Sequence, residues 1–221
     1  MPLCRLDDED GYIMIWDVIT GFEPALLLGF VLAGLILNIT PGADFVFISA
    51  SGIAGGPRIG VAAALGVNLG IVVHVVAAAV GVSALLLAHP AAYDTIRLGG
   101  AIYLVWMAIQ AWRSDSALGC GPAAPSVGQA LRRGLITNVL NPKTALFIFA
   151  FIPQFTDPAN GPIWMQILIL GAIFLVNGFL FVIFLAVASG YFANILRSHV
   201  GFLNKLTAIL FGGLAARLII N

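Results

Sequence analysis

The 221-residue chain is 61% hydrophobic and 9% charged, whereas soluble domains are roughly 45–50% apolar and about 25% charged. Ten Lys and Arg balance ten Asp and Glu, so no basic surplus can hold a phosphate backbone and no nucleic-acid partner is expected. A membrane-spanning helix needs about 20 apolar residues. The length therefore leaves room for several spans with short loops, and the composition predicts one membrane domain surrounded by lipid.

The first 24 residues differ from the rest because they contain an acidic cluster at residues 7–10. A signal peptide would carry Lys or Arg at this place, so we expect the first apolar span to be retained. Residues 1–24 are interpreted as an N-terminal tail and residues 25–221 as a single membrane domain. A start-site extension that ends before Met14 and a genuine disordered tail are both consistent with this pattern.

Six apolar runs, separated by Pro, Gly and charged residues, predict six transmembrane helices. They cover residues 25–50, 59–88, 96–112, 133–154, 162–188 and 200–219. One long polar connection, at residues 113–132, contains Gly and Pro in loop-forming combinations. The expected fold is therefore an all-α integral membrane protein with two halves, residues 25–112 and residues 133–221.

The two halves share a short pattern, which predicts an internal repeat. Residues 34–38 read GLILN and residues 134–138 read GLITN, and each run is followed by a proline, Pro41 or Pro142, one residue out of step. Each half contains three predicted spans, an odd number, so the second copy would enter the membrane in the opposite sense. This is the inverted-repeat plan of many secondary transporters. A chance match between two apolar helices is the alternative.

Prolines break the first and fourth predicted helices, at Pro41-Gly42 and at Pro142. A proline lacks the backbone N–H and clashes with the carbonyl four residues earlier. At mid-membrane depth, free backbone groups are tolerated only beside a cavity or a protein partner. We expect the two breaks to face each other around a pocket, and a kink filled by a neighbouring helix is the simpler alternative.

A charged residue follows each break within an apolar run, Asp44 in the first half and Lys143 in the second. A charge at the bilayer centre costs about 2.5–3.5 kcal/mol on insertion scales, so it is a functional candidate. We interpret the pair as a zwitterion site in which Lys143 attracts a carboxylate, while Asp44 attracts an ammonium or holds a coupling proton. A purely structural ion pair between spans one and four is the alternative.

Further polar side chains lie inside the predicted spans. Asn38 and Asn138, beside the breaks, are candidate substrate-binding or coupling residues, with interhelical hydrogen bonding as the alternative. His74 could relay protons because its unperturbed pKa is near 6.5, but a neutral imidazole bonded to a neighbouring helix is favoured. The three His and two Cys are dispersed, so no metal, cofactor or catalytic residue is expected.

Four motifs in order give the chain a family resemblance: LNITPGAD at residues 37–44, GPRIG at 56–60, GAIYLVW at 100–106, and NPKTALF at 141–147. Over residues 25–219 the chain resembles the LysE/RhtB amino-acid exporters. The resemblance implies export of amino acids or related metabolites across a bacterial inner membrane in exchange for protons. It also maps the family's Asn-Pro-Lys onto Asn141, Pro142 and Lys143, and its Pro-Gly-Pro-Asn or Pro-Gly-Pro-Asp onto residues 41–44, where Ala43 departs from the pattern.

The sequence thus predicts a secondary transporter, not an enzyme, with a small zwitterionic substrate, protons and lipid as partners. The alternative is a membrane channel or structural subunit in which Asp44 and Lys143 only stabilise helix packing. A membrane redox enzyme would require paired thiols within the spans, which the sequence lacks. Small-residue helix faces suit both internal packing and a homodimer, so the oligomeric state stays open.

Overall fold

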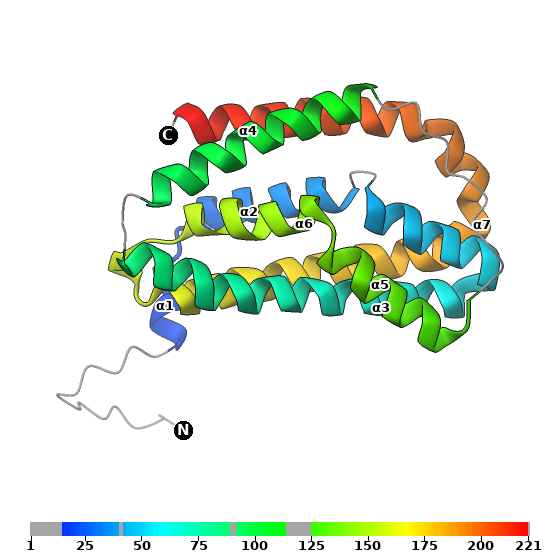
Figure 1. Cartoon of the computed structure of the whole chain (residues 1–221), viewed down its shortest axis with the longest axis horizontal. Coiled ribbons are helices and arrows are strands. Elements are labelled where there is room, and N and C mark those ends of the chain that lie inside the picture. The colour runs from blue at the N-terminus through cyan, green and yellow to red at the C-terminus, as the bar shows by residue number, and fades with distance from the viewer. Residues whose placement is uncertain (1–14, 40–41, 89–91, 114–124, 221) are drawn as a thin grey trace.

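The computed structural model describes residues 15–39, 42–88, 92–113 and 125–220, and this part of the chain contains helices and no strand (Figure 1). The α-helices are α1 (Ile15–Gly21), α2 (Pro24–Ile39), α3 (Ala43–Ala88), α4 (Ala92–Arg113), α5 (Val127–Val139), α6 (Pro142–Leu146) and α7 (Ile163–Ile220). After α6 come a π-helical turn, η1 (Phe147–Phe151), and two 3-10 turns, η2 (Ile152–Phe155) and η3 (Pro158–Asn160). The all-α class expected from the sequence is confirmed.

Two helical segments are each long and apolar enough to cross a membrane, Ala43–Leu85 of α3 and Ile163–Val187 of α7. Two bent pairs provide a further span each if each pair counts as one: α1 with α2, bent by 88°, and α5 with Pro142–Phe155, bent by 51°. The described residues therefore offer two to four candidate spans. Within the two bent pairs, α2 with 16 residues and α5 with 13 are each too short to cross a membrane alone. The expected number of six transmembrane helices therefore stays a prediction.

The structure has a break within α3 between the first two predicted spans, residues 25–50 and 59–88. Two helical segments of α3 meet at a kink at Gly56, whose φ is 75° and ψ is −179°. Glycine adopts positive φ without a steric penalty, and Pro57 then begins the next helical segment without needing a backbone donor. Gly56 lies within residues 51–58, the connection expected between these two spans.

The first part of α7 contains the candidate span Ile163–Val187, whose limits agree closely with the fifth predicted span, residues 162–188. The assigned helix α7 continues from Ile163 to Ile220, and Figure 1 shows it turning back, so that its last part lies beside α4. No proline occurs between residues 163 and 220. Every residue in this segment therefore keeps an N–H for helical hydrogen bonds on either side of the turn.

Residues 15–24, assigned to the tail from the sequence, contain the short helix α1. Val18 and Phe22, four residues apart, are both buried and belong to the main hydrophobic cluster. Val18 lies within α1, and Phe22 directly follows its last residue. The end of the tail therefore packs against the body of the molecule, whereas the acidic cluster, Cys4 and Cys120 lie outside the described residues.

The central helix α3 packs most extensively against α5 and α7. Its contact with α5 is close because glycines face backbone: a Cβ at Gly66 would collide with the Leu131 carbonyl oxygen, and one at Gly134 would collide with the Ala63 carbonyl oxygen. Small residues permit such backbone approach in membrane helices. This packing brings the end of α5 against the middle of α3.

An aromatic cluster fixes the segment that follows α6. Ring centroids within it are 4.8–6.2 Å apart. Its members come from α2, η1, η2 and α7, and they are Phe30, Phe147, Phe151, Phe155 and Phe174. Aromatic pairs in these arrangements add roughly 0.5–1.5 kcal/mol each beyond the burial of their area. The end of α6 is therefore held by this cluster, because Phe147 directly follows its last residue.

Candidate functional site

The interruption between α5 and α6 is capped by residues close to it. Asn141 is the N-cap of α6, and its Oδ1 accepts a hydrogen bond of 3.0 Å from the Lys143 backbone N–H. Pro142 lacks an N–H, so the Asn138 carbonyl, four residues earlier, has no ordinary helical donor. That carbonyl accepts instead from the Asn141 N–H at 2.9 Å and from His74 Nε2 of α3 at 3.1 Å. The backbone at this break is thereby satisfied.

The interruption between α2 and α3 depends on a side chain from the other half of the chain. Pro41 itself lies outside the described residues, but its position in the sequence deprives the Leu37 carbonyl of an i+4 donor. Lys143 Nζ donates to that carbonyl oxygen at 2.7 Å. The ammonium also complements the negative end of the α2 dipole. Gly42 leaves room for this reach, because a Cβ there would lie 3.2 Å from Lys143 Cδ.

Asp44, in the first turn of α3, is held by donors from the second break. Its Oδ2 accepts from Asn141 Nδ2 at 2.8 Å, from Asn138 Nδ2 at 2.9 Å and from Thr144 Oγ1 at 3.2 Å. Hydrogen bonds to a carboxylate are roughly twice as strong as neutral ones, and the positive end of the α3 dipole adds to them. A carboxylate from the first half is thus stabilised by polar groups from the second.

Three buried polar atoms at this place have no hydrogen-bond partner within the described part of the chain. They are the donor Asn38 Nδ2 and the acceptors Asp44 Oδ1 and Asn138 Oδ1. An unsatisfied buried group costs roughly 1–3 kcal/mol, so native structures retain few of them without a reason. Donor and acceptor capacity therefore remains at the site for a further molecule or a proton.

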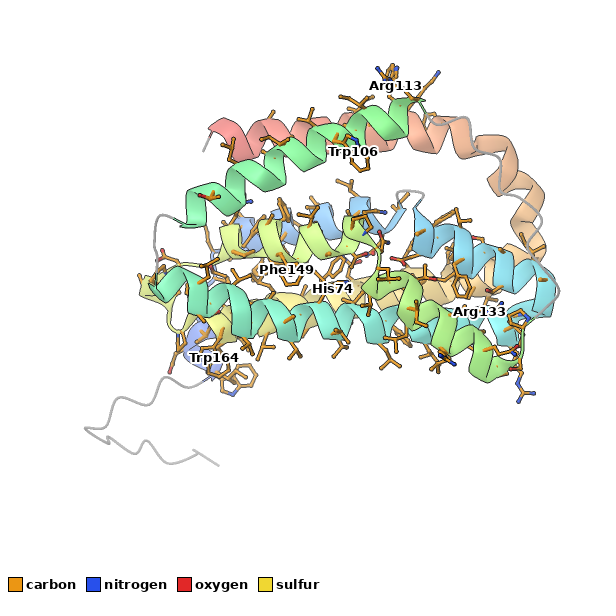
Figure 2. The ribbon with its side chains drawn as sticks, in the orientation of Figure 1. His74, Trp106, Arg113, Arg133, Phe149 and Trp164 are labelled. Carbon is orange, nitrogen blue, oxygen red and sulfur yellow. The ribbon has the colours of Figure 1, made fainter. Side chains whose placement is uncertain are left out.

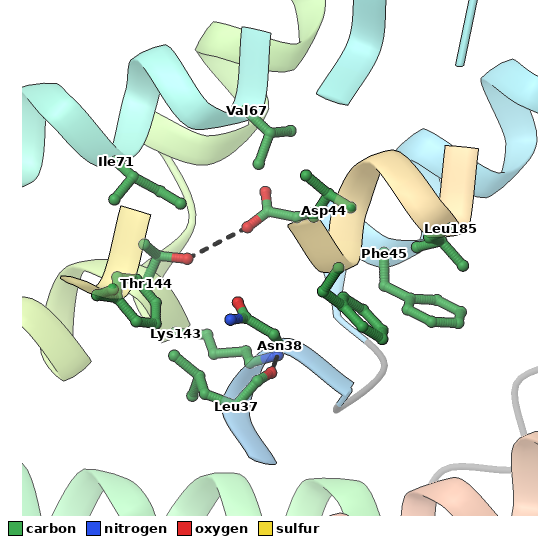
Figure 3. A pocket seen from close by; sticks show the side chains of 12 residues that line it. Leu37, Asn38, Asp44, Phe45, Val67, Ile71, Lys143, Thr144 and Leu185 are labelled. Carbon is green, nitrogen blue, oxygen red and sulfur yellow. Dashed lines mark hydrogen bonds between the residues drawn. The ribbon is translucent and has the colours of Figure 1, made fainter. Parts of the chain in front are cut away.

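A small cavity of about 30 Å³ lies between the two breaks (Figure 3). Four polar residues line it, namely Asn38, Asp44, Lys143 and Thr144, together with the apolar residues Leu37, Phe45, Val67, Ile71, Phe174, Phe181, Val182 and Leu185. The space suits one or two water molecules and is far below the roughly 300 Å³ of the smallest ordinary ligand pockets. In this arrangement the cavity is too small for an amino acid, so binding one requires the lining residues to separate.

Comparison with known proteins places the chain in a family. The model of the family described as LysE type translocator matches residues 35–221. The chain belongs to the LysE-type translocators. As a member it is a transporter and not an enzyme, and it is a multi-pass protein of the bacterial inner membrane. The resemblance expected from the four sequence motifs is therefore confirmed.

Several curated relatives resemble this translocator. An uncharacterized membrane protein of Vibrio cholerae is 34% identical over 146 residues, which are 65% of this chain and 71% of that protein. The homoserine/homoserine lactone efflux protein of Salmonella typhimurium is 33% identical over 64% of this chain and 69% of its own length. The leucine efflux protein of an Enterobacter species is 32% identical over 86% and 92%, respectively. No solved structure matches the chain.

The translocator's predicted site residues fall into two groups. Five of them, Asn38, Asp44, Asn138, Asn141 and Lys143, surround the cavity or bond directly to a residue that lines it. His74 lies behind this group and touches the Asn138 backbone. Among the residues expected to break helices, Pro142 begins α6 and Gly42 contacts Lys143.

Thr144 is a site residue that the sequence reasoning did not single out. Its hydroxyl bonds to Asp44 and it lines the cavity. The available signal was its position directly after Lys143, in the first turn of a helix that begins at a proline. A short polar residue next to Lys143 is a reasonable hydrogen-bond partner for the other candidate charge, Asp44. A threonine in an apolar run is nevertheless unremarkable by itself, because its hydroxyl can bond to its own helix.

Proposed function

We propose that this LysE-type translocator is a secondary transporter that exports amino acids or related small zwitterions in exchange for protons. The observation that carries the proposal is the reciprocal contact between the breaks. Asp44 is bound by the second break, and Lys143 reaches the first. Intramembrane charges next to a cavity mark substrate or ion pathways by default. Relatives named as homoserine and leucine efflux proteins support amino acids as the substrate class.

The charges at the cavity suit a zwitterion. Lys143 attracts the substrate carboxylate, and the unpaired Asn38 Nδ2 is available as a second donor for it. Asp44 attracts the substrate ammonium through its unpaired Oδ1. One charge of each sign lines the cavity, which favours a substrate with no net charge over a cationic amino acid.

Competition for Asp44 accounts for exchange with protons. Its Oδ2 already accepts three hydrogen bonds, so a proton would bind at Oδ1, which is also the oxygen available to a substrate ammonium. The two cations then exclude each other at one carboxylate. A cycle that carries substrate outward and a proton inward follows from this exclusion, provided that Asp44 faces one side of the membrane at a time.

The architecture proposed for this cycle is the pair of inverted three-helix repeats, residues 25–112 and 133–221, with six spans and proline breaks in helices one and four. The matched contacts support it: each proline leaves a carbonyl, at Leu37 or Asn138, to which a side chain of the opposite half donates. Rocking of one half against the other around a midplane site is the usual transport movement of such folds.

The alternative function is a channel or structural subunit in which Asp44 and Lys143 only hold helices together. Its support is that both charges already bond to protein partners in this arrangement. Two single variants, Asp44→Lys and Lys143→Asp, and the double charge swap separate the hypotheses. Loss of protein from the membrane in both single variants, with recovery in the double variant, favours the structural role.

The decisive experiment is counterflow of labelled amino acids into proteoliposomes. Wild type, Lys143→Ala and Lys205→Ala are reconstituted in parallel, because Lys205 is an exposed lysine of α7 and provides a matched control. We expect uptake of at least one amino acid by wild type and Lys205→Ala, and background uptake by Lys143→Ala. Normal uptake by Lys143→Ala would remove the proposed site, and inactivity of folded, inserted wild type would argue against amino-acid export.

A further inference from the structure

The two breaks share a feature that involves a residue outside the cavity, His74. The carbonyls four residues before Pro41 and Pro142 belong to Leu37 and Asn138. Lys143, from the second half, donates to the first carbonyl, and His74, from the first half, donates to the second. Each side chain thus replaces an N–H that a proline has removed from the opposite half. His74 corresponds to Lys143 in this respect.

The surroundings of His74 differ from those of Lys143. The imidazole is 6% exposed, and it meets the Phe149 ring edge-on, with centroids 5.8 Å apart (Figure 2). Because a carbonyl oxygen can only accept, Nε2 must carry the hydrogen in the bond to Asn138. His74 is therefore a buried donor with a fixed aromatic neighbour.

One turn earlier on α3, Gly70 faces the side chain of the same asparagine. A Cβ at Gly70 would lie 2.6 Å from both Cβ and Oδ1 of Asn138, closer than real contacts allow. Gly70 and His74 are four residues apart and so share a face of α3. Both residues contact Asn138. The glycine leaves space for the asparagine side chain, and the histidine donates a hydrogen bond to the asparagine carbonyl.

We infer that His74 and Gly70 are positioning residues that hold Asn138 so that its amide donates to Asp44. The inference rests on the proposed function. In this role the hydrogen on His74 Nε2 stays in its bond to the Asn138 carbonyl and is not passed along a proton pathway. The contact chain from His74 to Asp44 passes through the backbone and side-chain amide of Asn138. A neutral amide has no titratable proton to pass on, so this chain orients the site and does not conduct protons.

The test compares two substitutions of His74. Glutamine retains an N–H donor about as far from the backbone as Nε2 but does not titrate, and leucine removes the donor. We expect His74→Gln to keep more than half of the wild-type counterflow rate, with an unchanged dependence on pH, and His74→Leu to lose at least tenfold. If His74→Gln is as inactive as His74→Leu, or shifts the pH profile of transport, His74 is a relay and the inference fails.

A second pair of variants tests Gly70. Gly70→Ala is compared with Gly81→Ala, because a Cβ at Gly81 of the same helix meets nothing within 4 Å. We expect Gly70→Ala to reach the membrane but to transport at least tenfold more slowly, and Gly81→Ala to match wild type. Equal rates for the two variants would overturn the role of Gly70.

Thermal unfolding of the purified proteins in detergent keeps this inference separate from the proposed function. We expect the Tm of His74→Gln to stay near that of wild type, and those of His74→Leu and Gly70→Ala to fall. If wild type is inactive in counterflow while this order of Tm is found, the transport function fails and the positioning of Asn138 stands. If all variants share the wild-type Tm, the positioning fails whatever the transport activity.

Discussion

The two breaks in this translocator are stabilised in different ways. At the second break, Asn138, Asn141 and Thr144 are each at most 4% exposed, and a local cap and α3 satisfy the chain. At the first break, Asp44 is only half-buried, and the end of α2 bonds to a long, flexible lysine from the opposite half. We propose from this comparison that the second break is a rigid frame, and that the contacts to the first break are the ones that rearrange in the proposed transport cycle.

Removing the charge of Asp44 should break this arrangement most completely. In Asp44→Asn the neutral side chain can neither hold a coupling proton nor attract an ammonium, so we expect gradient-driven efflux to fall at least 100-fold. Efflux from vesicles is measured with an imposed pH gradient and again with an uncoupler. Asp17→Asn, on the exposed surface of α1, serves as the control, and wild-type efflux by Asp44→Asn would contradict proton exchange at this carboxylate.

Loss of the cap at the second break should have the next largest effect. Asn141→Ala removes a donor to Asp44 and the N-cap of α6, and a lost N-cap costs roughly 1 kcal/mol. We expect the maximal transport rate to fall about tenfold, because Lys143 in the first turn of α6 loses its fixed position.

The control for this variant is Ser126→Ala, which removes the capping box of α5, a cap outside the cavity lining. Kinetic parameters of counterflow are compared for both proteins. If Ser126→Ala slows transport as much as Asn141→Ala, the effect comes from helix stability alone and the frame has no special role.

The smallest of these effects is expected for Thr144→Val, which keeps the shape of the side chain and removes one donor to Asp44. Two donors remain on Oδ2, so we expect a loss of about threefold to tenfold, consistent with roughly 1 kcal/mol for one hydrogen bond. Thr137→Val on α5 is the matched control, since residue 137 does not line the cavity. Equal rates for the two variants in counterflow would show that Thr144 is dispensable for transport.

Sequence reasoning reached the polar residues of the site because intramembrane charges and prolines are costly in lipid and therefore conspicuous. Asp44, Lys143 and the two breaks stand out against apolar runs on that physical ground. The same reasoning placed a boundary around Gly56 and ended the fifth span at residue 188, close to the end of the candidate span Ile163–Val187. It did not predict how short the first of these connections is, because a single glycine with positive φ can take the place of a loop and hydropathy does not detect this.

The sequence by itself determined the class of protein, the family, and which groups had to find partners, because composition and missing backbone donors are local properties of the chain. Only the tertiary structure decided which partners they found. Lys143 bonds to the carbonyl of Leu37, Asp44 to three donors around Pro142, and His74 to a backbone carbonyl and not to the cavity. These pairings join residues 64 to 106 positions apart. The pairing of His74 with Asn138 depends on the close approach of α3 and α5 at glycines, which is decided by how the helices pack.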